Sequence, residues 1–356
     1  MNRENEVLFY TASHMPLEEN GIYLCALNQL DGSMRIINHM AGIEHCSYLT
    51  LNQAEDRLYA VSEKGEGEVY VYAIDKETCE LHLLDRKSTE GADPCYLSLT
   101  PDGQYLLVVN YSGGSVNVFE VLENGSLGEM TALIKHEGSS VHESRQEGPH
   151  PHSIIAEDSG SYAIVSDLGL DEVIMYRVEE GKLVTHQEIK LPEGSGPRLL
   201  AFHPTKKWAY GINELNNTIT TYTYSEREDS GELTILTHTS SLPKEFQEEN
   251  TAAHLAVSPC GRFLYASNRG NNSIALYEIE ESSGALTAVE WVSTFGKTPR
   301  HFSVMPGGYL LAANQDSNNI VSFHIEPDTG RLTQSGHVLE IPRPMCIQPM
   351  NSTCGD

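Results

Sequence analysis

The segment SPCGRFLYASNRGNNSIALYEI (residues 258–279) decides the fold, because its pattern returns along the chain. A turn with Pro and Gly leads into a short apolar and aromatic run that ends in a polar residue, Asn268, and a β-branched residue, Ile274, opens the next run six positions later. PDGQYLLVVNYSGGSVNVFEV (101–121) has the same order. Such runs between turns are typical of β-strands. The polar and β-branched pair also occurs at Glu63/Val69, Asn110/Val116, Asp167/Val173, Asn213/Ile219 and Asn314/Ile320.

Each repeat contains two further runs, which makes four predicted strands. The upstream runs begin 48, 57, 46, 55 and 47 residues apart. A last run opening with Leu-Thr follows an acidic turn, as in GELTIL (231–236) and GRLTQS (330–335). Blades of four strands that stack around an axis have this period, and coincidental similarity within a β-sandwich is the alternative. The upstream runs begin at Cys46, Pro94, Pro151, Pro197, Ala252 and Pro299.

Two incomplete pieces remain at the ends of the chain. Six complete repeats occupy about 46–341, residues 7–13 begin a repeat that lacks its first strand, and residues 344–349 form a first strand that lacks its repeat. We expect 344–349 to pair with 7–13 and to close the ring, so that no edge strand stays open. The sequence therefore predicts one all-β domain over 1–356, a seven-bladed β-propeller with four antiparallel strands per blade.

The composition argues against several classes of function. The 356 residues carry a formal net charge of −27, which disfavours nonspecific binding to nucleic acid or to an anionic membrane. No stretch approaches the roughly 18 consecutive apolar residues of a transmembrane helix, and the first ten residues lack the apolar core of a signal peptide. The seven cysteines never occur as C-x-x-C, so we expect reduced thiols and a cytoplasmic location.

One face of the predicted ring is favoured for the site. In an antiparallel blade, the loop entering the first strand and the loop between the second and third strands emerge on the same face. The two longest repeats owe their extra residues to 137–149 and 243–251, which both precede first strands on that face. Because functional residues favour loops on a rigid scaffold, we expect the site there.

Three arginines occupy corresponding places on this face. Arg198 and Arg300 follow the proline that opens a first strand, and Arg269 follows the polar residue that ends a second strand. In so acidic a chain we interpret them as a cationic funnel for a small anion, since Arg binds carboxylate or phosphate through two parallel hydrogen bonds. The alternative is that each Arg forms an ion pair with an acidic side chain of a neighbouring blade.

A carboxylate and two histidines are the candidates for proton transfer. Glu214 directly follows a second strand, where it would act as a general base or accept a hydrogen bond from substrate. A surface ion pair with Arg198 is the alternative for Glu214. His150 and His152 flank Pro151 in GPHPHS (148–153), and a histidine there would move a proton or bind an anion. The alternative for these two is a hydrogen-bonded structural pair.

The other polar residues that end second strands are predicted to contact substrate, as is Arg300. No H-x-x-x-H or C-x-x-C spacing supports a metal site, and no P-loop or Gly-x-Gly-x-x-Gly follows a strand, so we expect neither a metal nor a nucleotide cofactor. His254 and His301 lie one position deeper in their strands and are expected in the core. The predicted polar contacts are Asn110, Asp167, Asn213, Asn268 and Asn314.

Five ordered motifs resemble the lactonase family of seven-bladed propellers, which includes bacterial 6-phosphogluconolactonases and fungal carboxy-cis,cis-muconate cyclases. The resemblance runs from about residue 5 to 350, and the Trp-Asp pairs of WD40 repeats and the periodic Gly pairs of kelch repeats are missing. The motifs are GPHPHS (148–153), VSDLGLDEVIMYRV (165–178), GSGPRLLAFHP (194–204), YGINELNNTI (210–219) and SPCGRFLYASNRGNNSI (258–274).

The resemblance implies hydrolysis of a small anionic sugar lactone, 6-phospho-D-glucono-1,5-lactone, to 6-phosphogluconate in the pentose phosphate pathway, without nucleotide or obligatory metal. The Glu and two Arg proposed for the family match Glu214, Arg198 and Arg269 here. The family's His matches either His150 or His152, and this choice stays open. Alternatives are a lactone-forming cyclase with the same cationic pocket, a metal-dependent lactonase, and a noncatalytic propeller that binds a sugar acid or a protein.

Overall fold

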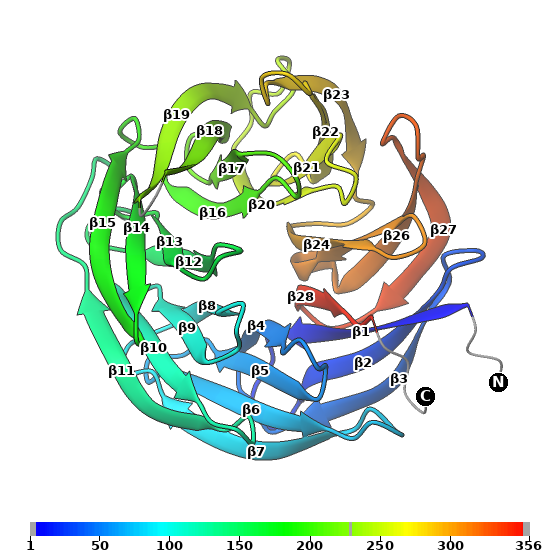
Figure 1. The fold of residues 1–356 in the computed structure, drawn as a ribbon. Coiled ribbons are helices and arrows are strands. Elements are labelled where there is room, and N and C mark those ends of the chain that lie inside the picture. Colours follow the sequence, from blue (N-terminus) through cyan, green and yellow to red (C-terminus); the bar gives the residue numbers. More distant parts are fainter. Residues whose placement is uncertain (1–4, 228–229, 352–356) are drawn as a thin grey trace.

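Seven four-stranded sheets form a ring around a central axis (Figure 1). The computed structural model describes residues 5–227 and 230–351. Strands that are neighbours in a sheet are antiparallel, and the first strand of each blade lies nearest the axis and contacts the first strands of the adjacent blades. The predicted all-β, seven-bladed propeller is therefore confirmed.

Each blade adds its strands in order from the axis outward. The first two blades contain β4 (Cys46–Leu51), β5 (Arg57–Ser62), β6 (Glu68–Ile74) and β7 (Leu81–Ser88), then β8 (Pro94–Leu99), β9 (Tyr105–Asn110), β10 (Ser115–Val121) and β11 (Leu127–Lys135). The third and fourth contain β12 (Pro151–Ala156), β13 (Tyr162–Asp167), β14 (Glu172–Glu179) and β15 (Lys182–Lys190), then β16 (Pro197–Phe202), β17 (Trp208–Asn213), β18 (Thr218–Arg227) and β19 (Ser230–Ser240).

The remaining strands complete the ring in the same order. The fifth and sixth blades contain β20 (Thr251–Val257), β21 (Phe263–Arg269), β22 (Ser273–Ile279) and β23 (Leu286–Ser293), then β24 (Pro299–Met305), β25 (Tyr309–Asn314), β26 (Asn319–Ile325) and β27 (Leu332–Glu340). The closing blade contains β28 (Pro344–Pro349), β1 (Glu6–Ser13), β2 (Asn20–Asn28) and β3 (Met34–Ala41). A 3-10 turn, η1, spans Gln315–Ser317. No helix in residues 5–227 and 230–351 is long and apolar enough to cross a membrane.

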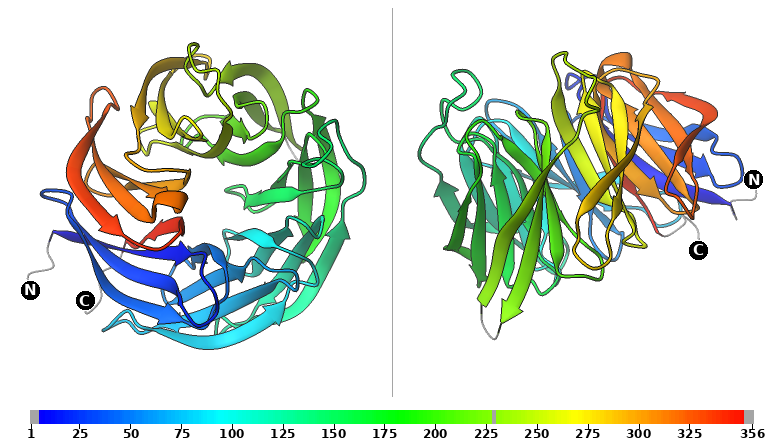
Figure 2. Two further views of the ribbon diagram at one scale, coloured as in Figure 1. Left: turned by 180° about the vertical axis from the view of Figure 1, so that it is seen from behind. Right: turned by 90° about the horizontal axis from the view of Figure 1, so that it is seen from above.

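The closing blade joins the two ends of the chain, as the sequence predicts. β28 pairs with β1, placing Ile347 opposite Thr11, and the two strands lie side by side in Figures 1 and 2. The Thr11 hydroxyl also donates to the Cys346 carbonyl oxygen at 2.8 Å. Because this pairing occupies the edges of both strands, the ring closes without a covalent link between them.

The core lies between the blades. Each apolar cluster combines side chains of two adjacent blades, as where Tyr59 and Val61 of β5 pack with Val108 of β9 and Phe119 of β10. Buried tyrosines also tie blades together, since the Tyr59 hydroxyl donates to the carbonyl oxygen of Gly125 in the next blade at 2.9 Å. A single blade has no such partner, so the blades stabilise one another.

The cysteines differ from expectation at one position. Cys79 is disulfide-bonded, which corrects the prediction that all seven cysteines are reduced thiols. Five others are free, and Cys354 lies outside the described residues. The free cysteines are Cys25, Cys46, Cys95, Cys260 and Cys346.

Candidate active site

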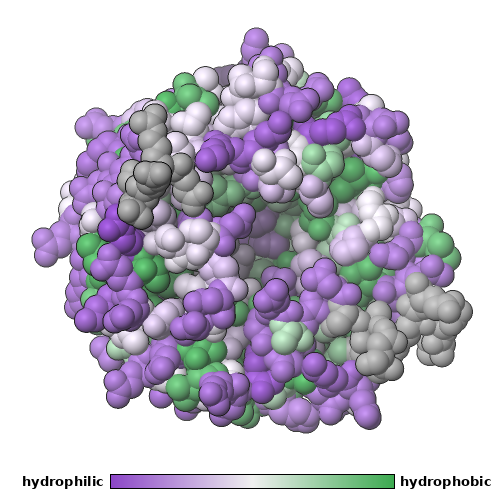
Figure 3. Space-filling model, viewed as in Figure 1, coloured by the Kyte–Doolittle hydropathy of each residue, from purple (hydrophilic) through white to green (hydrophobic). Residues whose placement is uncertain are grey.

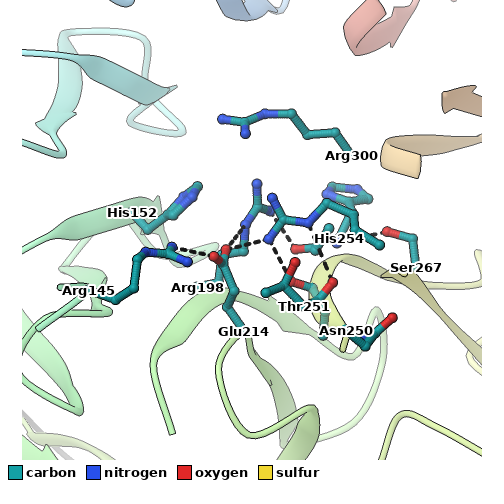
Figure 4. Close-up of polar contacts among 12 residues, drawn as sticks. Arg145, His152, Arg198, Glu214, Asn250, Thr251, His254, Ser267 and Arg300 are labelled. Atoms are coloured by element: carbon teal, nitrogen blue, oxygen red, sulfur yellow. Dashed lines mark hydrogen bonds and ion pairs between the residues drawn. The ribbon is translucent and has the colours of Figure 1, made fainter. Parts of the chain in front are cut away.

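Three guanidinium groups share one carboxylate near the axis (Figure 4). The Arg198 Nε donates to Glu214 Oε2 at 2.9 Å, and the Arg269 Nη2 lies 2.7 Å from the same oxygen. The Arg145 Nη2 donates to the other oxygen, Oε1. Only 3% of the Glu214 side chain is exposed. The group, called the arginine cluster below, keeps two uncompensated positive charges in a strongly acidic protein.

Strand geometry places the members of the arginine cluster. The β16–β17 register shifts between Pro197 and Leu199, so Arg198 is the extra residue of a β-bulge. A bulge re-aims its side chain, and this one turns Arg198 toward Glu214, which directly follows β17. Arg269 ends β21 in the next blade, and its Nη2 also donates to the Ala252 carbonyl oxygen at 3.1 Å.

The same bulge recurs in every blade, and the bulged side chains line a small cavity at the axis, the inner cavity. The register of six first strands shifts just after the opening residue, and that of β20 shifts after its second residue, Ala252. The inner cavity has a volume of about 20 Å³, which is room for about one water molecule. The residues that line it are Ser47, Tyr48, Cys95, Tyr96, His152, Arg198, Leu199, His254, Arg300, His301 and Met345.

A larger cavity of about 650 Å³, the outer cavity, lies beside the arginine cluster. Arg145 and Arg269 line it, whereas Arg198 lines the inner cavity. The space-filling view shows the centre of the ring hollowed, with hydrophilic and hydrophobic residues around the hollow (Figure 3). The arginine cluster thus borders a space of substrate size on one side and a space of water size on the other.

Electrostatics fix the charge of the cluster. Burial favours neutral Glu214, but Arg269, Arg198 and the other positive neighbours outweigh it and hold the pKa of Glu214 well below its ordinary value. Burial and the neighbouring Arg269 lower the pKa of Arg198 to about 9, which keeps the guanidinium charged at neutral pH. Burial works against the charge of Arg145, yet Glu214 outweighs it and raises the pKa of Arg145. Glu214 is therefore an anion and a weak base that organises the guanidiniums.

The two candidate histidines have different surroundings. The His150 ring stacks on Tyr111 with the ring centroids 4.5 Å apart, and its Nδ1 lies 3.0 Å from the Tyr111 carbonyl oxygen. The His152 ring lines the inner cavity, with its Nδ1 3.7 Å from Cys95 Sγ. Burial and the charge of Arg198 hold the pKa of His152 well below its ordinary value, so the ring is neutral at pH 7. Of the two rings, His152 is placed to accept a proton beside Arg198.

Arg300 stands apart from the arginine cluster. Its guanidinium lies across a gap from His152 and Arg198 (Figure 4), and it lines the inner cavity. The Arg300 Nη2 is 3.6 Å from Glu63 Oε2, which is too long for a hydrogen bond. The ion-pair alternative therefore holds for Arg269, which contacts Glu214 of the neighbouring blade at 2.7 Å, and only loosely for Arg300. Arg198 pairs with Glu214 within its own blade.

The similarity to known proteins covers nearly the whole chain. The family model described as "Lactonase, 7-bladed beta-propeller" matches residues 9–349. The chain belongs to this lactonase family. The family resemblance predicted from the five motifs is confirmed.

Similar lactonase-family proteins include two curated relatives and a solved structure. The 6-phosphogluconolactonase of Bacillus subtilis strain 168 is 34% identical over 298 residues, which are 83% of this chain and 84% of the relative. The 6-phosphogluconolactonase of Formosa agariphila is 33% identical over 298 residues, which are 81% of this chain and 83% of the relative. The periplasmic gluconolactonase of Pseudomonas aeruginosa superposes with a TM-score of 0.90 at 30% identity, covering 98% of this chain and 100% of that one. These similarities place the chain among lactone hydrolases.

Arg145 is a member of the cluster that sequence reasoning missed in this lactonase-family chain. It lies in the long loop 137–149, which has no counterpart in the other repeats, and its Nη2 also donates to the Tyr111 hydroxyl at 3.3 Å. The loop is held closely, because a Cβ on Gly169 would lie 1.9 Å from the Gly148 carbonyl oxygen. The sequence feature that could have identified Arg145 is its position in a long loop on the face predicted to carry the site.

Five residues predicted to contact substrate have a different role in the structure. Their side chains are completely buried and line neither cavity of the site. The Asn213 Nδ2, for example, donates to the Thr218 and Thr220 hydroxyls at 2.8 and 2.9 Å. Their amides and carboxylate hold the loops of the scaffold instead. These residues are Asn110, Asp167, Asn213, Asn268 and Asn314.

The two deeper histidines, which the sequence predicts in the core, line the inner cavity as well. The rings of His254 and His301 pack with centroids 3.9 Å apart, and burial with the nearby Arg198 lowers the pKa of His301 to about 3. Within the described part of the chain, no three His, Cys, Asp or Glu side chains are placed to hold a metal ion.

Proposed function

We propose that this chain hydrolyses 6-phospho-D-glucono-1,5-lactone to 6-phosphogluconate, as its curated relatives' names suggest. The observation that carries the proposal is the arginine cluster, whose two uncompensated positive charges lie next to a neutral histidine. A phosphate monoester carries a charge of about −1.5 to −2 at pH 7, so substrate and site complement each other.

In the proposed mechanism, water attacks the C1 carbonyl of the lactone. His152 accepts a proton from that water, and the Arg198 guanidinium stabilises the oxyanion that forms. The tetrahedral intermediate then collapses, the bond between C1 and the ring oxygen breaks, and protonated His152 returns the proton to the leaving ring oxygen. The products are the C1 carboxylic acid, which ionises, and the C5 hydroxyl. Glu214 keeps Arg198 in place and takes no proton, because guanidinium N–H groups contact both of its oxygens.

The inner cavity supports this assignment of the water. It holds about one water molecule and is lined by both His152 and Arg198. A cyclase would instead need a proton donor, and a histidine whose pKa is held so low is a poor donor at neutral pH. Hydrolysis therefore fits the site better than lactone formation. This lactone also opens in water without an enzyme, so a modest acceleration by the protein is enough. The proposed reaction is a step of the pentose phosphate pathway.

A coupled assay with freshly made 6-phosphogluconolactone tests the proposal. We expect Arg198→Ala to lower kcat/KM about 100- to 1000-fold, and His152→Ala about 100-fold or more. Arg331→Ala is the matched control, since Arg331 is an exposed arginine that pairs with Glu290. Equal rates for wild type, both variants and buffer would support a noncatalytic binding protein instead.

A cytoplasmic location is part of the same proposal. The free cysteines support it, the disulfide at Cys79 does not, and the Pseudomonas relative is named as periplasmic. Fractionation of the native host with a tagged chain tests the location, and recovery in the periplasm would contradict it.

A further inference from the structure

The arginine cluster faces two cavities with different members. Arg198 lines the inner cavity of about 20 Å³, and Arg145 and Arg269 line the outer cavity of about 650 Å³. All three hold the same Glu214 carboxylate, so the two cavities meet at this residue. A ligand that spans the cluster would touch different guanidiniums at its two ends.

Only the outer cavity has room for a phosphate group. A tetrahedral phosphate is several times larger than the single water that the inner cavity holds. The phosphate therefore stays in the outer cavity, and the lactone carbonyl lies at the mouth of the inner cavity, facing the water beside His152 and Arg198.

The outer cavity also presents unused donors. Among the residues that the structure describes, Arg145 uses only its Nη2 in hydrogen bonds, and Arg269 uses its Nε and Nη2. The remaining N–H groups of both guanidiniums have no hydrogen-bond partner there. About a third of the Arg145 side chain, 34%, is exposed, which leaves it accessible to a ligand. Glu249 and His142 also line this cavity; both are exposed, and solvent screens the charge of Glu249.

We propose that the outer cavity binds the phosphate of the substrate through Arg145 and Arg269, and that Arg145 determines the preference for phosphorylated over neutral sugar lactones. This inference rests on the proposed hydrolysis. Arg145 is a specificity-determining residue here and does not act on the carbonyl, because it lines only the outer cavity. Hydrogen bonds from Arg to a phosphate are charge-assisted and strong, which makes such a preference large.

The test compares kcat/KM for 6-phosphogluconolactone and glucono-1,5-lactone in wild type, Arg145→Gln, Arg145→Lys and the control Arg331→Gln. We expect wild type to prefer the phosphorylated lactone and Arg145→Gln to reduce that preference about 10- to 100-fold. Arg145→Lys keeps the charge and should restore part of the preference. Arg331→Gln should leave both values unchanged.

Two results would overturn the inference while the proposed hydrolysis survives. One is a wild type that hydrolyses both lactones equally well, and the other is an Arg145→Gln variant that loses activity on both to the same extent, as a purely structural role would give. If wild type hydrolyses neither lactone, the proposed hydrolysis fails, and calorimetry with 6-phosphogluconate and gluconate decides the inference. Selective binding of 6-phosphogluconate that Arg145→Gln abolishes supports it, and equal or absent binding of the two overturns it.

Discussion

Replacing Glu214 with Gln removes the carboxylate on which three guanidiniums converge. Gln keeps the size of the side chain, so the change tests the charge and leaves the packing in place. The Glu214 side chain is 3% exposed and that of Arg198 is 7% exposed, so water cannot replace the lost counter-charge. Losing one partner of a buried ion pair typically costs about 3–5 kcal/mol.

We expect Glu214→Gln to lower the free energy of unfolding by about 3 kcal/mol, the lower end of that range. The lower end applies because 34% of the Arg145 side chain is exposed and solvent screens its charge. Glu290→Gln is the matched control, since Glu290 pairs with Arg331 at the surface and an exposed pair contributes at most about 1 kcal/mol.

Urea unfolding of wild type and both variants, followed by tryptophan fluorescence, measures these differences. Inorganic phosphate should raise the unfolding midpoint of Glu214→Gln more than that of wild type, because a bound anion supplies the missing charge. A loss of less than about 1 kcal/mol for Glu214→Gln, matching the Glu290→Gln control, would refute the reasoning.

Three further changes test other parts of the structure. Deleting residues 343–356 removes β28 and opens the ring, so we expect a lower melting temperature, and an unchanged one would contradict the closure. Because burial and Arg198 hold the pKa of His152 well below its ordinary value, the base form persists on acidification, and kcat/KM for glucono-1,5-lactone, which carries no titrating phosphate, should stay flat as the pH falls through 6.5. An inflection at pH 6.5 or above would exclude His152 as the base. Gly169→Ala places a Cβ 1.9 Å from the Gly148 carbonyl oxygen, so calorimetry should show weaker binding of 6-phosphogluconate through displacement of the loop that carries Arg145, and wild-type affinity would speak against that role.

The fold was readable from the sequence because each repeat carries the same strand and turn pattern. A blade cannot bury its faces alone, so seven repeats with incomplete ends predict a closed ring. The pairing of 344–349 with 7–13 follows from the same reasoning and is confirmed by the register of Ile347 opposite Thr11.

The site was readable only where a residue departs from the repeat. Arg269 and Glu214 stand at one repeated position but differ from their counterparts in the other blades, and the structure brings them together with Arg198. Asn110 and Asn213 occupy the same positions as asparagines of other blades, and such recurrence reflects a scaffold role that alignment alone does not reveal. Arg145 could not be aligned, because its loop has no counterpart.

The way an exposed loop reaches the axis is also hidden from the sequence. Gln146 is completely buried, and its Nε2 donates to the Leu168 carbonyl oxygen at 2.9 Å, which anchors the loop beside Arg145. This contact depends on where the folded chain places the loop with Gln146 relative to Leu168, and the composition of neither segment predicts it.

Carbon-13 NMR of 6-phosphogluconolactone labelled at C1 tests the central claim most directly, because it follows the lactone carbonyl without a coupling enzyme. With catalytic amounts of the protein, we expect the lactone signal to convert to the carboxylate signal much faster than in buffer. The acceleration should be lost in Arg198→Ala and kept in Arg331→Ala. Progress curves that superimpose on the buffer curve would contradict the account.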